Sequence, residues 1–166
     1  MSQTLPVDSL KGRVALVTGS SRGIGADTAR YLAEAGADVV INYRNKAPRA
    51  QKLADELRGL GVRALVVGAD LTDATSVQQM FAEVEREFGS LDILVLNASG
   101  GMEAGMAEDY ALALNRDAQV RVLDTALPLL AAGSRVVFVT SHQAHFIRTT
   151  PTMPEYEPVA LSKRAG

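Results

Sequence analysis

The feature that most constrains the fold of this chain is a glycine-rich segment, residues 18–25, which reads T-G-S-S-R-G-I-G. It follows an apolar run at residues 13–17 that is typical of a strand buried within a parallel sheet. Three glycines allow a sharp turn and a close approach of the backbone to a ligand, and the first N–H groups of a following helix are free to bind negative charge. The segment therefore predicts a phosphate-binding turn. The alternative interpretation is a tight strand-to-helix turn that merely happens to be rich in glycine.

The segment after this turn has apolar side chains at helical spacing. These residues are Ile24, Thr28, Tyr31, Leu32 and Ala35. We expect them to form the face of a helix that packs against the sheet. No Lys-Ser or Lys-Thr pair follows the last glycine, which excludes a Walker-type loop.

The rest of the chain repeats the alternation of strand and helix. Apolar runs predict further strands at residues 37–41, 62–67, 91–96 and 135–140. Helical spacing predicts helices at residues 48–60, at 73–88 with Asp73 as the N-cap, and from Glu108 to Ala131. Residues 142–157 are expected to form a loop, and Pro158 to lie in the first turn of a last helix. Five alternating units predict right-handed βαβ crossovers, and thus an α/β fold with a doubly wound parallel sheet and helices on both faces.

Ligands of such sheets bind beyond the carboxyl ends of the strands. The glycine-rich turn, residues 42–44, Asp70, residues 97–101 and Ser141 all lie at expected strand ends. We therefore expect residues 1–166 to form a single dinucleotide-binding domain.

Composition narrows the classes of partner. Of the 166 residues 47% are hydrophobic and 22% charged, which is ordinary for a globular protein, and a net charge of −2 without long charged blocks does not favour nucleic acid. No apolar run approaches the roughly 18 residues of a membrane span, and the first ten residues do not resemble a signal peptide. We expect a cytoplasmic protein with no membrane partner. The absence of cysteine excludes thiolate metal sites.

The glycine-rich turn matches the T-G-x-x-x-G-I-G cofactor loop of the short-chain dehydrogenase/reductase family, and Asp70-Leu71 resembles its contact with the adenine ring. Asn97-Ala98 matches half of the family's N-N-A-G segment. This resemblance covers nearly the whole chain and implies a Rossmann-type sheet of five strands in the order 3-2-1-4-5. The cofactor-binding residues that it implies are Gly19, Ser21, Arg22, Gly23, Ile24, Gly25, Asn42, Tyr43, Arg44, Asp70, Leu71, Asn97 and Ala98.

Charge at the second strand end favours NADP(H) over NAD(H). A carboxylate there would bind the ribose hydroxyls of NAD and repel a 2′-phosphate. This chain has Asn42 instead, with Arg44 beyond it and Arg22 in the loop, and two guanidinium groups can hold a phosphate. The alternative is that Arg44 is only an exposed cation in a polar turn.

The resemblance implies catalytic roles for four residues. Ser141 would polarise a carbonyl, Lys163 corresponds to the Lys of the family's S-K-x-A segment, and Asn115 would order a water in the proton relay. The family's proton-donating Tyr stands four residues before that Lys, but here the position is Val159, whose isopropyl group cannot transfer a proton. Tyr156 lies three residues further upstream, and its phenol is a candidate replacement that would swing towards Ser141. The alternative is that Tyr156 simply packs on the proline-containing loop.

His142 and His145 flank the same loop. A His beside a catalytic Ser can shuttle protons near pH 7, but surface or hydrogen-bonding roles are the simpler interpretation. No third ligand stands near them in the sequence, so we predict no metal site.

The sequence thus predicts an NADP(H)-dependent oxidoreductase that transfers hydride between the nicotinamide and a carbonyl or alcohol substrate. The alternative, favoured by Val159, is an NADP(H)-binding protein with little or no turnover that acts as a sensor or as a non-catalytic partner in an assembly. We expect a small-molecule substrate and, if the chain is complete, a homo-oligomer formed through the helix from Glu108 to Ala131. Because members of the family continue beyond the equivalent of Gly166, we expect the domain to be incomplete at its C-terminus.

Overall fold

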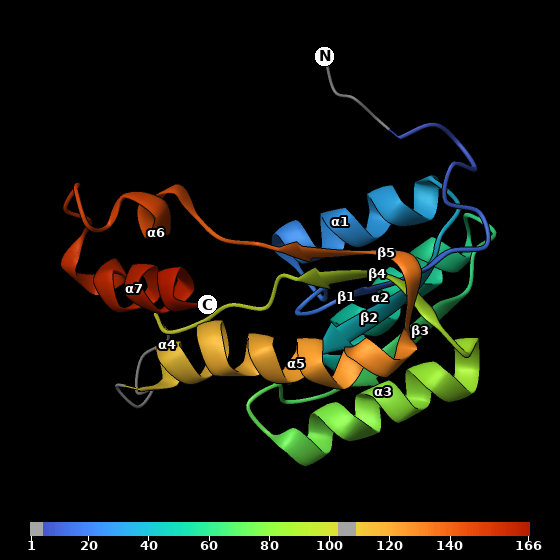
Figure 1. Cartoon of the computed structure of the whole chain (residues 1–166). Helices are drawn as coiled ribbons and strands as arrows, with labels where there is room; N and C mark the ends of the chain where they lie inside the picture. Colours follow the sequence, from blue (N-terminus) through green and yellow to red (C-terminus); the bar gives the residue numbers. More distant parts are fainter. Residues whose placement is uncertain (1–4, 103–108) are drawn as a thin grey trace.

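The computed structural model describes residues 5–102 and 109–166, which form a five-stranded sheet with helices on both faces (Figure 1). The strand order is β3-β2-β1-β4-β5, and all four neighbouring pairs are parallel. The strands are β1 (Val14–Val17), β2 (Asp38–Tyr43), β3 (Ala64–Gly68), β4 (Leu91–Leu96) and β5 (Leu130–Phe138). This arrangement confirms the predicted fold class and strand order.

Helices alternate with these strands. The first three are α1 (Gly23–Glu34), α2 (Ala47–Arg58) and α3 (Ala74–Phe88). After β4 come α4 (Tyr110–Leu112), the π-helix η1 (Ala113–Asp117), α5 (Ala118–Ala126) and the 3-10 turn η2 (Leu127–Leu129). After β5 come α6 (His142–Phe146), the 3-10 turn η3 (Pro154–Tyr156) and α7 (Glu157–Ala165).

Two hydrophobic clusters hold the layers together, one on each face of the sheet. Val39 and Ile41 of β2 belong to the cluster beneath α1 and α2, whereas Val40 between them belongs to the cluster beneath α3 and α5. Successive side chains of a strand point to opposite faces. Burial of both faces is why these strands read as continuous apolar runs.

The face by which α1 packs differs from the prediction. Its buried residues are Gly25, Ala26, Ala29 and Ala33, whereas Ile24 is 69% and Tyr31 51% exposed. The predicted apolar face was therefore wrong for Ile24 and Tyr31, whereas Leu32 packs against the cluster and Ala35 is buried. Small side chains form the contact because they let the helix approach the sheet closely, and Ile24 is left at the edge of the ligand cavity.

Helices α2 and α3 follow the prediction more closely. The Asp73 carboxylate accepts hydrogen bonds from the N–H groups of Thr75 and Ser76, which confirms the predicted N-cap of α3. Helix α2 ends at Arg58, so Leu60, predicted as the last residue of this helix, lies beyond it and is exposed.

The predicted long helix from Glu108 to Ala131 was wrong in its C-terminal bound and its continuity. Glu108 lies outside the described residues, and from Tyr110 onwards the helix is interrupted by a π-helical turn. It ends at η2, where Pro128 has no backbone N–H to continue the bonding, and Ala131 belongs to β5. Between the pairs Leu91–Leu130 and Ile93–Arg135 the register shifts, so β5 bulges there.

The segment predicted as a loop at residues 142–157 was also partly wrong. It contains α6 and the turn η3. Ser141 is the N-cap of α6, and its hydroxyl accepts a hydrogen bond from the Ala144 N–H at 3.1 Å. Helix α7 begins at Glu157, and Pro158 lies in its first turn, as predicted. Within the described ranges no helix has the length and apolar character needed to span a membrane.

Candidate cofactor site and active site

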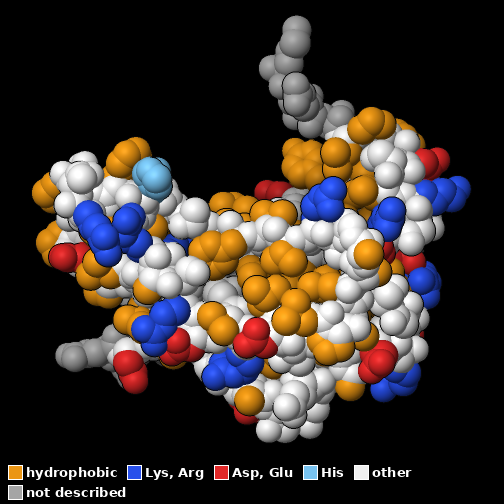
Figure 2. All heavy atoms as spheres, in the orientation of Figure 1, with side chains coloured by type: hydrophobic (Ala, Val, Ile, Leu, Met, Phe, Trp, Pro, Cys, Tyr) orange, Lys and Arg blue, Asp and Glu red, His pale blue; other side chains and the backbone are white. Residues whose placement is uncertain are grey.

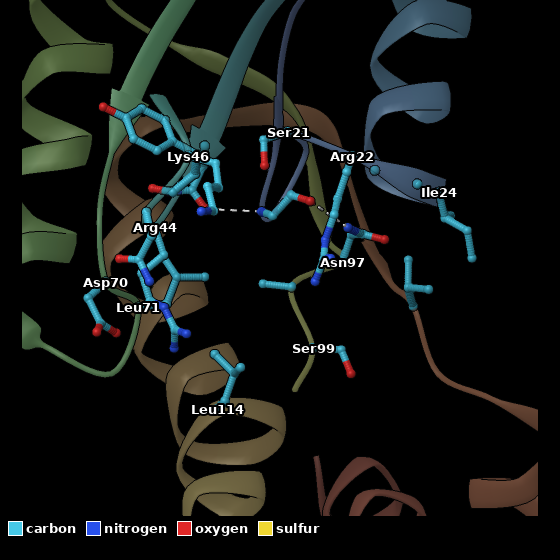
Figure 3. Close-up of a pocket in the computed structure, with 18 of the residues that line it drawn as sticks. Ser21, Arg22, Ile24, Arg44, Lys46, Asp70, Leu71, Asn97, Ser99 and Leu114 are labelled. Carbon is cyan, nitrogen blue, oxygen red and sulfur yellow. Dashed lines mark hydrogen bonds between the residues drawn. The ribbon is translucent and has the colours of Figure 1, made fainter. Parts of the chain in front are cut away.

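A cavity of about 680 Å³ opens at the carboxyl ends of the strands (Figure 3). It brings together the glycine-rich turn, the end of β2, the segment after β3, the segment after β4, the end of β5 and α7. All thirteen residues predicted to bind the cofactor line this cavity, as do Ser141, Tyr156 and Lys163. Asn115 is not among the described residues that line it.

The glycine-rich turn owes its shape to three glycines. Gly19 and Gly23 have φ values of +62° and +55°, in the left-handed region that favours glycine. At Gly25 space is the constraint, because an added Cβ would lie 2.5 Å from the Asn97 amide nitrogen. Helix α1 begins at Gly23, and no side chain of the described residues caps its first N–H groups. These donors therefore suit an anionic ligand.

Asn42 is hydrogen-bonded to the glycine-rich turn. Its side chain is buried, and its Oδ1 accepts a hydrogen bond from the backbone N–H of Gly19 at 3.0 Å. The buried Ser20 hydroxyl donates to Val17 O at 2.7 Å, which fixes the turn to β1. Asn42 thus positions the loop as well as lining the cavity.

The segment after β4 is fastened to the same turn. The Asn97 amide donates to Thr18 O at 2.9 Å, and the N–H groups of Asn97 and Ala98 both donate to the Thr18 hydroxyl. The floor of the cavity is therefore one hydrogen-bonded unit made from two strand ends.

Positive charge dominates the described lining of the cavity. The cations are Arg22, Arg44, Lys46, Arg49 and Lys163, and Asp70 is the only carboxylate among the described lining residues. Figure 3 shows Arg22 directed towards Ser99 and Arg44 on the side of Asp70 and Leu71, so the two guanidinium groups approach the cavity from different sides. Sequence reasoning missed Lys46 and Arg49, although both follow Arg44 closely at the start of α2. Such a charge distribution suits a ligand that carries several phosphates.

The Asp70 carboxylate accepts hydrogen bonds from the Thr72 N–H at 2.9 Å and from the Thr72 hydroxyl at 2.7 Å. Burial alone would raise the pKa of Asp70, but these two bonds and the charge of Arg44 outweigh it and lower that pKa below its ordinary value. Asp70 is therefore ionised at neutral pH.

At the other end of the cavity, the structure brings Tyr156 to Ser141. The Tyr156 hydroxyl donates to Ser141 Oγ at 3.5 Å, the upper end of the hydrogen-bond range. Tyr156 also borders a second cavity of about 310 Å³, with Arg22, Ser99, Gly100, Met102 and Val159. The phenol therefore lies between the main cavity and a neighbouring one.

Lys163 reaches the same region from α7. Only 8% of it is exposed, and its Nζ donates to Val139 O at 3.1 Å. Burial lowers the pKa of the Lys163 ammonium below its ordinary value.

Val159 is buried, and its side chain packs near Gly101, where an added Cβ would lie 3.2 Å from Val159 Cγ2. It supplies no polar atom to either cavity. The tyrosine hydroxyl that contacts Ser141 belongs to Tyr156, three residues before Val159.

Asn115 lies in the π-helix η1 and is buried. Its Nδ2 donates to Gly100 O at 2.8 Å and to Ser162 Oγ at 3.0 Å. These bonds tie α7 to the segment after β4, and the role of Asn115 in a water relay stays a prediction. Sequence reasoning missed a similar residue, Gln119, whose Nε2 donates to Ala98 O and Leu114 O.

The sheet order, the glycine-rich turn at the switch point and the cation-lined cavity define a Rossmann-type domain. The sequence matches the family described as short chain dehydrogenase over residues 13–157, and the chain belongs to this family.

Two curated relatives illustrate the similarity. The short chain dehydrogenase claC of Passalora fulva is 39% identical over 140 residues, which are 80% of this chain and 52% of that protein. The hydroxynaphthalene reductase-like protein Arp2 of Metarhizium robertsii is 41% identical over 143 residues, which are 82% of this chain and 54% of that protein. The chain thus spans about half the length of these relatives.

Among solved structures, a short chain dehydrogenase from Burkholderia cenocepacia J2315 in complex with NADP superimposes with a TM-score of 0.84 at 38% identity. The match covers 94% of this chain and 64% of that one. The family and this neighbour support a nicotinamide cofactor.

Proposed function

We propose that this chain is the cofactor-binding part of an NADP(H)-dependent oxidoreductase that transfers hydride between the nicotinamide and a carbonyl or alcohol substrate. The observation that carries the proposal is the approach of the Tyr156 hydroxyl to Ser141 Oγ in the same cavity as Lys163. Family membership and the NADP-bound structural neighbour support the reaction class.

The residues at the strand ends fit such a cofactor. The free N–H groups at the start of α1 suit its pyrophosphate, and Arg44, Lys46 and Arg49 supply positive charge for a 2′-phosphate. Asp70, which accepts two hydrogen bonds from Thr72, would accept a hydrogen bond from the adenine amino group. When bound, the cofactor supplies hydride for reduction or accepts it for oxidation.

The other end of the cavity would handle the substrate oxygen. Ser141 would donate a hydrogen bond that polarises a carbonyl, and the Tyr156 hydroxyl would give its proton to that oxygen as hydride reaches the carbon. Lys163, as a buried cation, would favour loss of the phenolic proton and its later replacement. In oxidation the same groups act in reverse.

The decisive test is turnover of NADPH by Tyr156→Phe. The change removes one hydroxyl, and loss of general acid catalysis typically lowers the rate by about 10² to 10⁴. We expect kcat to fall in this range while NADPH binding stays unchanged. Tyr31→Phe, on the exposed side of α1, is the matched control and should behave as the unsubstituted protein. Unchanged turnover in Tyr156→Phe would refute the assignment of the acid.

The second candidate, an NADP(H)-binding protein with little turnover, is favoured by Val159, which packs where the family places its Tyr. The unsubstituted protein should be tested on a panel of aliphatic and aromatic ketones, the latter because one relative is named a hydroxynaphthalene reductase-like protein. Tight NADPH binding without turnover of any compound would favour this candidate.

We also propose that the protein forms a homo-oligomer through the helical segment after β4. Val120 of α5 and Leu127 of η2 are exposed, and Figure 2 shows apolar side chains gathered across the middle of the molecule. Light scattering that reports a monomer at all concentrations would refute this proposal.

A further inference from the structure

Tyr110 borders the cavity opposite the end of β2, and sequence reasoning did not single it out. It is the first residue of α4, and Arg44 follows directly after β2, so the two are 66 positions apart in the chain. The fold brings them together at the end of the cavity that contains Asp70 and is proposed to hold the adenosine of the cofactor.

Two contacts join these side chains. Arg44 Nη1 donates a hydrogen bond to the Tyr110 hydroxyl. The Arg44 guanidinium carbon also lies 5.6 Å from the centroid of the Tyr110 ring, within the range of a cation–π interaction. The Tyr110 hydroxyl therefore accepts a hydrogen bond from the guanidinium, and the Tyr110 ring lies within range of its positive charge.

Tyr110 is itself held in place by the core. Its ring is partly buried and packs against the hydrophobic cluster formed by the sheet with α3 and α5. A tyrosine has few side-chain rotamers, whereas an exposed arginine has many. The contact thus restricts the flexible Arg44 side chain by joining it to the well-packed Tyr110 ring.

The other cations at this end of the cavity have no such support. Within the described part of the chain, the side chains of Lys46 and Arg49 make no hydrogen bond or ion pair with another residue. Arg44 is thus the cation at this end that another side chain orients. A preorganised donor loses less conformational entropy when it binds a phosphate.

We propose that Tyr110 is a specificity-determining positioning residue that holds the Arg44 guanidinium ready for the 2′-phosphate of NADP(H). The inference rests on the proposed function and adds the residue that orients the discriminating cation. Tyr110 acts through Arg44, so its effect should be confined to ligands that carry this phosphate.

The test uses calorimetric titration with adenosine 2′,5′-bisphosphate and with 5′-AMP, which differ by the 2′-phosphate alone. We expect Tyr110→Phe, which keeps the ring and removes the hydroxyl, to weaken binding of the bisphosphate by about fivefold, the value of one hydrogen bond. Binding of 5′-AMP should stay unchanged, as should both affinities in the control Tyr31→Phe.

A double-substitution cycle separates positioning from general damage. Arg44→Ala should remove most of the preference for the bisphosphate, and adding Tyr110→Phe to it should cause no further loss. If Tyr110→Phe proves unstable, Arg44→Lys keeps the charge but loses the guanidinium fork, and it should reduce the preference similarly.

The outcomes distinguish the two proposals. If Arg44→Ala loses the preference while Tyr110→Phe keeps it or binds the bisphosphate more tightly, the inference about Tyr110 is overturned and the proposed cofactor stands. If the unsubstituted protein binds both nucleotides equally, the proposed NADP(H) preference fails, and this inference fails with it.

Discussion

Gly25 is the position at which one added methyl group reports most directly on how tightly the glycine-rich turn is packed. In Gly25→Ala the new Cβ would lie 2.5 Å from Asn97 Nδ2, 2.8 Å from Gly19 O and 2.9 Å from Ser20 Cα. Two of these atoms belong to the backbone, so rotation of a side chain alone cannot relieve the contacts. The turn and the segment after β4 have to separate.

The magnitude follows from three contributions. Overpacking of this kind costs about 1–3 kcal/mol. Displacement of the Asn97 amide weakens its hydrogen bond to Thr18 O, worth about 1 kcal/mol. Alanine within a helix is more favourable than glycine by about 1 kcal/mol, which offsets part of this loss. We therefore expect the free energy of unfolding to fall by about 1–3 kcal/mol.

Denaturant unfolding measures this loss, and Gly59→Ala at the end of α2 is the matched control. Gly59 has a φ of −61°, and the nearest atom to its added Cβ is Glu56 O at 3.1 Å, on an exposed helix end. The control should change stability by no more than about 0.5 kcal/mol. Gly25→Ala should also weaken NADPH and NADH binding alike. Unchanged stability together with unchanged binding would refute the close packing on which this reasoning rests.

Two further predictions concern carboxylates. Asp92 accepts hydrogen bonds from the Arg13 guanidinium at 2.7 Å and from the Val14 N–H at 2.9 Å, so Asp92→Ala should lower the free energy of unfolding by about 1–3 kcal/mol in denaturant unfolding. Arg13→Ala removes only the exposed partner and should lower it by less than about 1 kcal/mol. Equal losses in the two variants would contradict the larger contribution of the Val14 bond. Because the pKa of Asp70 is lowered in the folded protein, its ionised form stabilises the fold above the ordinary pKa of an aspartate, and this stabilisation is lost as pH falls through the lowered value. The difference in unfolding free energy between the unsubstituted protein and Asp70→Asn should therefore shrink on acidification, and a difference that does not vary with pH would count against the bonds from Thr72.

Much of the fold could be predicted because its signals are local. Strands buried on both faces require uninterrupted apolar runs, and a helix such as α3 carries its own cap in Asp73 and its own stop in Gly89. Errors arose where a local signal competed with tertiary packing. Helical spacing predicted a helix as far as Ala131, but Pro128 ends the helical bonding and Ala131 belongs to β5.

The ligand cavity could also be predicted in outline, since the carboxyl ends of parallel strands meet at one edge of the sheet. The proximity of Tyr156 to Ser141 was a hypothesis from spacing, and the structure describes the contact at 3.5 Å. The partners of Asn115 could not be predicted, because Gly100 and Ser162 lie in two separate segments that meet η1 only in the folded chain.

The sequence by itself determined the alternation of strands and helices and the glycine-rich turn with Arg22 in it, because each depends on residues adjacent in the chain. Only the tertiary structure decided that Arg44 meets Tyr110, that Tyr156 approaches Ser141, and that Val159 is buried near Gly101. These contacts join residues from separate elements, and their geometry is set by how closely helices pack on the sheet. Small differences in side-chain volume control that distance, and no periodicity in the sequence records it.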